Sequence, residues 1–187
     1  MPADCVVTGL HSNLINVKFD AVVSGINFGA NMGTDIIYSG TCAAARQGIL
    51  YGVPSIALSI DPIDWKKASE EGFKFSALAD FAAKNLEKLI SICKTDYPRM
   101  FVNVNAASLD EYKGVKFAET LCDREYNDIL EVSGDEKLTA RFKSGATETV
   151  KDSRSDYYIC RDGYIAVSLV YAEPVAGKCV DGIDFSL

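Results

Sequence analysis

The chain has 187 residues, of which 48% are apolar and 10% aromatic, which is enough for the core of one domain and excludes a disordered protein. Its formal net charge is −7 and no basic run occurs, so the composition excludes sequence-independent binding to a nucleic-acid backbone. No apolar run approaches the ~20 residues of a membrane span, and no basic segment precedes an apolar one at the N-terminus. We therefore expect a cytoplasmic protein without nucleic-acid or membrane partners.

The first elements predict a strand-helix-strand unit. Residues Pro2 to about Leu14 have the apolar spacing of a short helix, and the run from Phe19 to Ile26 predicts a strand buried on both faces of a parallel sheet. A helix is expected from about Ser39 to Leu50, followed by a strand from Ser55 to Ile60. In such a unit the crossover is right-handed, and the loop after the first strand lies at the carboxyl end of the sheet.

The next elements continue the alternation of strands and helices. One long helix is predicted from about Trp65 to Thr95, with an apolar stripe at spacings of three and four, and a buried strand from Met100 to Val104. The resulting order within residues 1–105 is typical of a doubly wound α/β core.

The sequence after Asn105 changes to short alternating runs, which indicate antiparallel strands and hairpins. These runs are followed by a helical turn at 156–161 and a strand at 164–170. We interpret residues 1–187 as one domain, with an α/β core at 1–105 and a β-rich extension at 106–187.

The six cysteines are scattered through the chain without a Cys-x-x-Cys pair. This spacing argues against a zinc knuckle or a redox motif. We expect buried free thiols rather than disulfides, as is usual for a cytosolic domain.

A glycine- and asparagine-rich loop follows the first predicted strand. Gly25, Gly29 and Gly33 recur every four residues, and Asn27 and Asn31 keep the same step. Glycine allows a backbone to turn left-handed or to approach a bound group closely. A strand, a glycine-rich turn and a helix N-terminus together favour phosphate binding, although the spacing is neither that of a P-loop nor that of a dinucleotide-binding fingerprint.

Five residues of this segment are candidates for ligand binding. The side-chain oxygen of Asn27 is suited to a hard cation such as Mg²⁺ or Mn²⁺, while the alternative is that Asn27 only caps the turn. Asn31, Ser39, Gly40 and Thr41 offer amide and hydroxyl donors to a phosphate at a helix N-terminus, and the alternative is an ordinary N-cap.

Three other polar residues are expected to have no role in ligand binding. We interpret Asp35 and Asp61 as solvated turn residues, and His11, the only histidine, as a surface residue. A Ser-His-Asp or Cys-His mechanism would have to use His11. We therefore identify no catalytic side chain beyond a metal site.

Three motifs of this segment resemble the SurE family of metal-dependent nucleotide phosphatases. They are Val-Val-Ser-Gly-Ile-Asn-x-Gly-x-Asn-x-Gly at 22–33, Tyr-Ser-Gly-Thr-x-x-Ala-Ala at 38–45 and Pro-Ser-Ile-Ala-x-Ser at 54–59. Weaker similarities lie at 2–6, 101–105, 113–115 and 162–168.

The resemblance implies a three-layer, Rossmann-like α/β fold with a mostly parallel sheet and a β-rich C-terminal extension. It implies a 5'/3'-nucleotidase, similar to an acid phosphatase, that hydrolyses nucleoside monophosphates or other phosphomonoesters with Mg²⁺ or Mn²⁺. The matching positions make Asn27 a metal ligand, and they place Asn31, Ser39, Gly40 and Thr41 around the phosphate. In this family the extension mediates subunit contacts, which implies a homo-oligomer, either a dimer or a tetramer.

The sequence departs from the family pattern in one respect. Family members carry two adjacent aspartates after an earlier first strand and a serine in a later loop as further metal ligands, whereas this sequence contains no Asp-Asp pair. We thus expect the family's N-terminal segment to be absent here. The alternative to an enzyme is a catalytically impaired phosphate- or nucleotide-binding oligomer, either a relic or a fragment.

Overall fold

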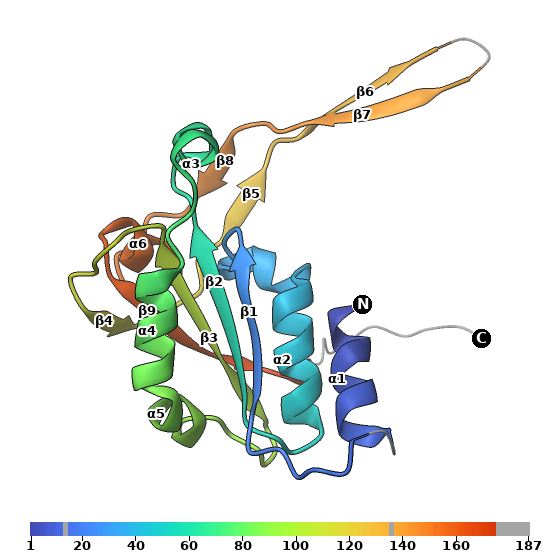
Figure 1. Cartoon of the computed structure of the whole chain (residues 1–187). Helices are drawn as coiled ribbons and strands as arrows, with labels where there is room; N and C mark the ends of the chain where they lie inside the picture. Colours follow the sequence, from blue (N-terminus) through green and yellow to red (C-terminus); the bar gives the residue numbers. More distant parts are fainter. Residues whose placement is uncertain (13–14, 135–136, 175–187) are drawn as a thin grey trace, which may run out of the picture.

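The computed structural model describes residues 1–12, 15–134 and 137–174, and it shows a central sheet with helices on both faces and a projecting β arm (Figure 1). The helices are α1 (Pro2–His11), the 3-10 helix η1 (Gly33–Ile37), α2 (Gly40–Leu50), α3 (Trp65–Glu71), α4 (Ser76–Lys84), α5 (Leu86–Ser91) and α6 (Asp156–Arg161). The strands are β1 (Val22–Phe28), β2 (Ser55–Asp61), β3 (Met100–Ala107), β4 (Val115–Phe117), β5 (Arg124–Tyr126), β6 (Ile129–Ser133), β7 (Thr139–Lys143), β8 (Thr147–Thr149) and β9 (Ile165–Tyr171). None of the helices within the described ranges has the length and apolar character needed to cross a membrane.

The central sheet has the strand order β1-β2-β3-β9-β4. The pairs β1–β2, β2–β3 and β4–β9 are parallel, and only β3–β9 is antiparallel. The parallel pairing of β1 with β2 across α2 confirms the predicted strand-helix-strand unit. It also brings the ends of β1 and β2 to the same edge of the sheet, where Asn27 lies beside Ser59.

Helices cover both faces of this sheet and make three layers. On one face, Cys42, Ala45 and Ile49 of α2 pack against Ala57 and Phe101 of the sheet. On the other face, α4 and α5 pack their apolar side chains against β2, β3 and β9. Figure 1 shows α1 beside α2 and away from the sheet. The predicted mixed α/β architecture is thus confirmed.

Strand β1 differs from its predicted environment. It pairs with β2 alone among the described strands, and Val23 remains 49% exposed. The prediction that this strand is buried on both faces is wrong in this structure, because β1 lies at the edge of the described sheet and its residues alternate between half-buried and exposed positions.

The long helix predicted from Trp65 to Thr95 is in fact three helices. Gly72, with φ +82°, ends α3, a backbone conformation that side-chain-bearing residues rarely adopt. Between α4 and α5 the side chain of Asn85 donates a hydrogen bond to the carbonyl of Phe81 at 2.9 Å. Most of the predicted apolar stripe is nevertheless buried, because the breaks leave Leu78 and Leu89 on the face that meets the sheet, whereas Leu86 is exposed.

The C-terminal region contributes to both the sheet and the arm. β9 and β4 lie in the central sheet, whereas β5–β8 and β6–β7 form two-stranded pairs outside it. Figure 1 shows the β6–β7 hairpin extending away from the body. Several large apolar side chains on it are exposed, namely Ile129, Leu130, Val132, Leu138 and Phe142.

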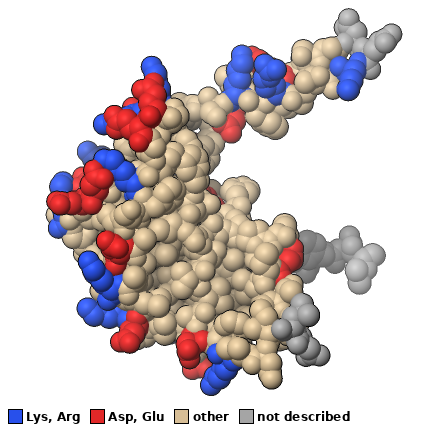
Figure 2. All heavy atoms as spheres, in the orientation of Figure 1, with Lys and Arg blue, Asp and Glu red and all other residues tan. Residues whose placement is uncertain are grey.

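Charged side chains of both signs are mixed on the face seen in Figure 2, along one edge and on the hairpin. On this face no extended basic patch is drawn among the described residues. The view agrees with the net charge of −7.

Candidate active site

The glycine-rich segment that runs from β1 into the following loop is held at two points where only glycine fits. A Cβ on Gly25, which has φ +117°, would lie 2.2 Å from the carbonyl oxygen of Leu58. A Cβ on Gly33, with φ +55°, would lie 1.7 Å from the carbonyl oxygen of Cys122. These close approaches fix the loop between β2 on one side and the segment before β5 on the other.

Asn31 fastens the middle of the loop to the sheet. Its backbone nitrogen donates to Oδ1 of Asn105 at 2.9 Å, and its side-chain nitrogen donates to Oγ of Ser59 at 2.7 Å. Its carbonyl accepts from the side-chain amides of Asn103 and Asn105 at 2.9 and 3.0 Å. The polar groups of Asn31 are thus paired with residues of β2 and β3, and only 6% of its surface is exposed.

Asp156, at the start of α6, fastens the end of the loop. Its carboxylate accepts hydrogen bonds from the backbone nitrogens of Gly33 at 2.8 Å, Cys122 at 2.9 Å and Tyr157 at 2.8 Å. Burial raises the pKa of the Asp156 carboxyl, and these three amide hydrogen bonds oppose that shift. A single buried carboxylate therefore joins the loop, the segment before β5 and α6.

Asn27 lies at the carboxyl end of β1 and faces a cavity of about 700 Å³. Its side-chain nitrogen donates to the carbonyl of Gly29 at 2.9 Å. Because this bond occupies the nitrogen, Oδ1 is the side-chain atom left for a ligand. The backbone of residues 28–30 forms the adjoining wall.

The remaining walls of this cavity come from elements far apart in the sequence. Asp61 ends β2, Trp65 begins α3, and Arg124 and Tyr126 belong to β5. Residues of the arm near 128 and 144–147 complete the rim. Figure 1 shows α3, β5 and β8 gathered beyond the carboxyl ends of β1 and β2, where open α/β sheets bind their ligands.

Asp35 is enclosed by two partners from β5. Arg124 forms an ion pair with its carboxylate, and the Tyr126 hydroxyl donates a hydrogen bond to it. Burial, together with the hydrogen bond to Asp35, raises the pKa of Tyr126. The interpretation of Asp35 as a solvated turn residue is therefore wrong, because its carboxylate is paired with protein groups rather than with water. These partners lie about ninety residues further along the chain.

Asp61 is also buried, with 6% of its surface exposed. Its Oδ1 accepts from the backbone nitrogen of Ile63 at 3.0 Å, and its Oδ2 lies 3.6 Å from a guanidinium nitrogen of Arg161. The ring of Tyr157 lies between two cations, 4.9 Å from the Arg161 guanidinium carbon and 5.2 Å from that of Arg124. Asp61 is a wall residue, so its interpretation as a solvated turn residue is wrong as well.

The other predicted ligands lie outside the walls of this cavity. Ser39 is the N-cap of α2, and its hydroxyl accepts from the backbone nitrogen of Cys42 at 3.0 Å. A Cβ on Gly40 would lie 3.1 Å from Cγ of Pro2, so α1 covers this helix start. Neither Asn31 nor the segment from Ser39 to Thr41 lines the cavity with Asn27.

The described residues do not by themselves provide the ligands of a divalent cation. They contain no group of three or more histidine, cysteine, aspartate or glutamate side chains placed to hold a metal ion. Asn27 offers one neutral oxygen, and the nearby carboxylate of Asp61 faces Arg161. Mg²⁺ and Mn²⁺ are held mainly by carboxylates and water, so the described residues do not fit such an ion on their own.

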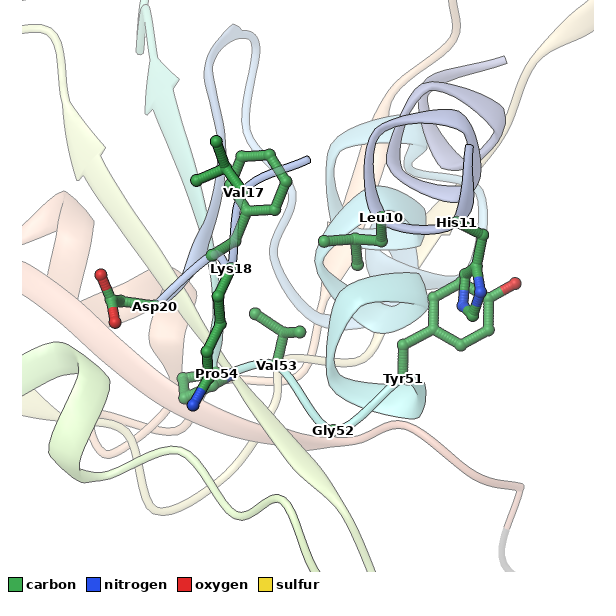
Figure 3. A pocket seen from close by; sticks show the side chains of 10 residues that line it. Leu10, His11, Val17, Lys18, Asp20, Tyr51, Gly52, Val53 and Pro54 are labelled. Carbon is green, nitrogen blue, oxygen red and sulfur yellow. The ribbon is translucent and has the colours of Figure 1, made fainter. Parts of the chain in front are cut away.

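A second cavity, of about 420 Å³, lies at the opposite end of the sheet, around the segments that precede β1 and β2 (Figure 3). The ring of His11 lies against Tyr51, with centroids 4.1 Å apart. His11 is exposed, which confirms its interpretation as a surface residue.

The five cysteines in the described ranges are free thiols, as predicted. Cys42, Cys122 and Cys160 are buried. Burial raises the pKa of each of these three thiols. Buried thiols of this kind serve packing rather than nucleophilic chemistry.

Three wall residues were not identified from the sequence, namely Trp65, Arg124 and Tyr126. Trp65 follows the carboxyl end of β2 closely, and this position is a signal that could have identified it. The sequence around Arg124 and Tyr126 contains no such local signal. These residues reach the cavity because β5 pairs with β8, which is a contact between distant segments.

An open, mostly parallel sheet with a glycine-rich loop and a cavity at its carboxyl edge defines an α/β protein of the class in which small ligands bind at that edge. The family model described as Survival protein SurE matches residues 1–128. The chain belongs to the SurE family.

Individual relatives extend this match. A 5'-nucleotidase SurE of Petrotoga mobilis is 36% identical over 170 residues, which cover 89% of this chain and 64% of that protein. Another, from Treponema pallidum, is 41% identical over 117 residues, which cover 63% of this chain and 59% of that protein. The chain therefore spans less than two thirds of the length of these relatives.

A solved structure supports the fold directly. The crystal structure of the SurE protein from Aquifex aeolicus superimposes with a TM-score of 0.70 at 29% identity. The match covers 93% of this chain and 68% of that one. This similarity confirms the predicted SurE-like α/β fold.

Proposed function

We propose that this chain is part of a nucleoside monophosphate phosphatase, a 5'/3'-nucleotidase that hydrolyses phosphomonoesters with the help of a divalent cation. The observation that carries the proposal is Asn27, whose Oδ1 is left for a ligand in a cavity at the carboxyl edge of the sheet. The similar proteins named 5'-nucleotidase SurE support this activity.

The proposed cation is Mg²⁺ or Mn²⁺, with Asn27 as one ligand. When bound, such an ion supplies charge neutralisation and an activated water. The described residues contain no group of three or more acidic, histidine or cysteine side chains placed to hold a metal ion, so the proposal requires further ligands from elsewhere. The role of this chain is to position one oxygen ligand and to shape the cavity around the ester.

The proposed phosphate ligands are Asn31, Ser39, Gly40 and Thr41. In this structure the side-chain nitrogen of Asn31 is engaged by Ser59, and the hydroxyl of Ser39 by the backbone of Cys42. Phosphate binding through these groups thus requires an exchange of partners. The start of α2 favours an anion, but the backbone nitrogen of Cys42 there already donates to Ser39, so an anion that bound it would replace this bond as well.

The test is hydrolysis of a nucleoside monophosphate by the purified 187-residue chain, with and without Mg²⁺ or Mn²⁺. We expect no cation-stimulated release of phosphate, because one neutral amide oxygen does not hold a divalent ion. Where the gene encodes an upstream acidic pair, the longer protein is expected to gain this activity and to lose it in Asn27→Ala.

A longer protein that binds nucleotide but releases no phosphate under any metal condition would favour the alternative, a catalytically impaired nucleotide-binding oligomer. The observation behind this alternative is that Asn27 offers only one neutral oxygen and that the described residues contain no group of side chains placed to hold a metal ion. Robust cation-dependent turnover by the 187-residue chain, abolished in Asn27→Ala, would instead show that its own residues complete the metal site.

For assembly, the proposed partner is a second copy of this chain, bound through the β6–β7 hairpin to give a dimer or a tetramer. The hairpin projects from the body and exposes several large apolar side chains (Figure 1). Such a patch is more typical of an interface than of a monomer surface.

Light scattering tests this assembly through the particle mass, which we expect to be a multiple of 20.3 kDa. The double change Leu130→Glu and Phe142→Glu is expected to lower it to the monomer value, while Tyr97→Glu, at an exposed position off the hairpin, leaves it unchanged. The free thiols support the further proposal of a cytoplasmic location.

A further inference from the structure

Two aromatic side chains form one wall of the cavity beside Asn27. Phe28 and Trp65 meet edge to face with ring centroids 5.1 Å apart, and Phe73 supports Phe28 from behind with centroids 3.8 Å apart. Phe28 nevertheless remains 51% exposed and Trp65 55% exposed. We call Phe28 and Trp65 the aromatic wall.

Aromatic rings that are fixed by neighbours and yet open to a cavity are suited to stacking against a planar ligand. Trp65 carries the largest aromatic ring system available to a protein. Its neighbour Phe28 has little freedom to fill the space, because Phe73 and Trp65 pack against two sides of it. The aromatic wall is thus preorganised for a flat ring rather than for a flexible chain.

The aromatic wall lies within one nucleotide's length of the proposed metal ligand. A Cβ on Gly29 would lie 3.8 Å from the side-chain nitrogen of Asn27 and 3.8 Å from the outer ring of Trp65. Asn27 and Trp65 thus flank the same glycine. The cavity of about 700 Å³ is within the ~300–1,000 Å³ range of small-molecule sites, which accommodates a nucleotide.

The charges of the other lining residues bear on which part of such a ligand lies beside them. These residues include the carboxylates of Asp35, Asp61 and Asp128; Arg124 pairs with Asp35, and Arg161, which does not line the cavity, pairs with Asp61. Carboxylates in the wall disfavour additional phosphates. The uncharged base of a nucleotide instead carries N–H groups that can donate hydrogen bonds to carboxylates.

We propose that the aromatic wall binds the base of the nucleotide by stacking, with Trp65 as the main contact and Phe28 as its support. This inference rests on the proposed nucleotidase function and adds the residues that recognise the leaving group. It predicts that the protein distinguishes nucleoside monophosphates from sugar phosphates that lack a base.

Trp65 is the only tryptophan in the chain, so its fluorescence reports on this wall alone. The 187-residue chain is titrated with adenosine 5'-monophosphate and with ribose 5-phosphate, with and without Mg²⁺. We expect saturable quenching by the nucleotide and none by the sugar phosphate. Phe28→Ala is expected to weaken the nucleotide titration by about tenfold, which is the scale of base stacking on one aromatic side chain.

Calorimetry provides the matched comparison for Trp65 itself. Trp65→Ala is expected to weaken nucleotide binding by about tenfold or more, and Trp65→Phe by less, because it keeps an aromatic face. Tyr97→Ala, which removes an exposed ring elsewhere, serves as the control and should change nothing. Equal affinity in Trp65→Ala and the wild type, equal quenching by both ligands, or no nucleotide binding at all would overturn the inference.

Turnover by the longer, metal-loaded protein separates this inference from the proposed function. Failure of the proposed function means that neither ester is hydrolysed. Failure of the inference alone means that both are hydrolysed, with the same ratio of kcat/KM in wild type and Trp65→Ala. The inference holds when Trp65→Ala lowers kcat/KM for the nucleotide and leaves that for ribose 5-phosphate unchanged.

Discussion

The two halves of the glycine-rich segment have different surroundings. Residues 27–30 line an open cavity, whereas residues 31–33 are buried against the sheet and α6. Both halves contain the same asparagine-glycine step. The same glycine-rich composition therefore serves ligand approach in residues 27–30 and close backbone packing in residues 31–33. Both demand a residue without a side chain.

The largest expected effect comes from Asp156, which holds the buried half. Asp156→Ala leaves the backbone nitrogens of Gly33, Cys122 and Tyr157 without their acceptor. At ~1–3 kcal/mol for each unsatisfied buried group, we expect the free energy of unfolding to fall by about 4 kcal/mol. Urea denaturation measures this change.

Asp156→Asn keeps the shape and one acceptor oxygen, so we expect a smaller loss, which can be measured even where the alanine variant does not fold. Asp110→Ala removes an exposed ion pair with Lys74 and is the matched control. Equal midpoints for the Asp156 and Asp110 variants would contradict the anchoring role.

The second prediction compares one glycine from each half. Gly33→Ala places a Cβ against the Cys122 carbonyl, and we expect a loss of roughly 3 kcal/mol or more in unfolding free energy. Around Gly29 the nearest atoms lie 3.8 Å away, so Gly29→Ala brings only the strain of φ +113°, about 1–2 kcal/mol. Thermal or urea unfolding of both variants measures these two losses of unfolding free energy. Equal losses would show that the two halves are equally packed and would contradict the prediction.

The third prediction compares the two asparagines. Asn31→Ala removes a buried hydrogen bond to Ser59 and is expected to lower the free energy of unfolding by about 1–3 kcal/mol. Asn27→Ala should leave stability nearly unchanged. In a form of the protein that hydrolyses phosphomonoesters, it should lower kcat at least about tenfold, equivalent to ~1.4 kcal/mol of barrier. Unchanged turnover across a metal titration would remove Asn27 from the site.

The smallest expected effect is at the start of α2. Ser39→Ala removes the side-chain cap on Cys42 and is expected to lower the free energy of unfolding by about 1 kcal/mol. If Ser39 also contributes to phosphate binding, the same change weakens the affinity for inorganic phosphate, measured by calorimetry. Ser39→Asp restores the cap and adds a negative charge, so it should recover stability without recovering phosphate binding.

The sequence predicted α2 and the strands β2, β3 and β9 well, because their apolar runs and the cap of α2 are local signals. It did not reveal the two interruptions between Trp65 and Thr95, since the apolar stripe continues across Gly72 and Asn85. A stripe records which face is buried, and it is compatible with one helix or with three.

The sequence predicted only the part of the site that depends on local patterns. Asn27 lies directly at the end of a strand, and its place at the sheet edge follows from the local pattern. Asp35 and Asp61 are paired with Arg124 and Arg161, which the chain brings back from far along the sequence. Local patterns carry no information about such partners, so the acidic wall could not be predicted.

The stack of Tyr157 between Arg124 and Arg161 has a mechanical consequence. The two cations pair with Asp35 and Asp61, so a continuous series of charges and one ring joins two carboxylates of the cavity wall. Moving Asp35 away from Asp61 would require breaking an ion pair or unstacking the ring. Two residues that lie 26 positions apart in the sequence are therefore coupled through a ring that belongs to neither of their elements.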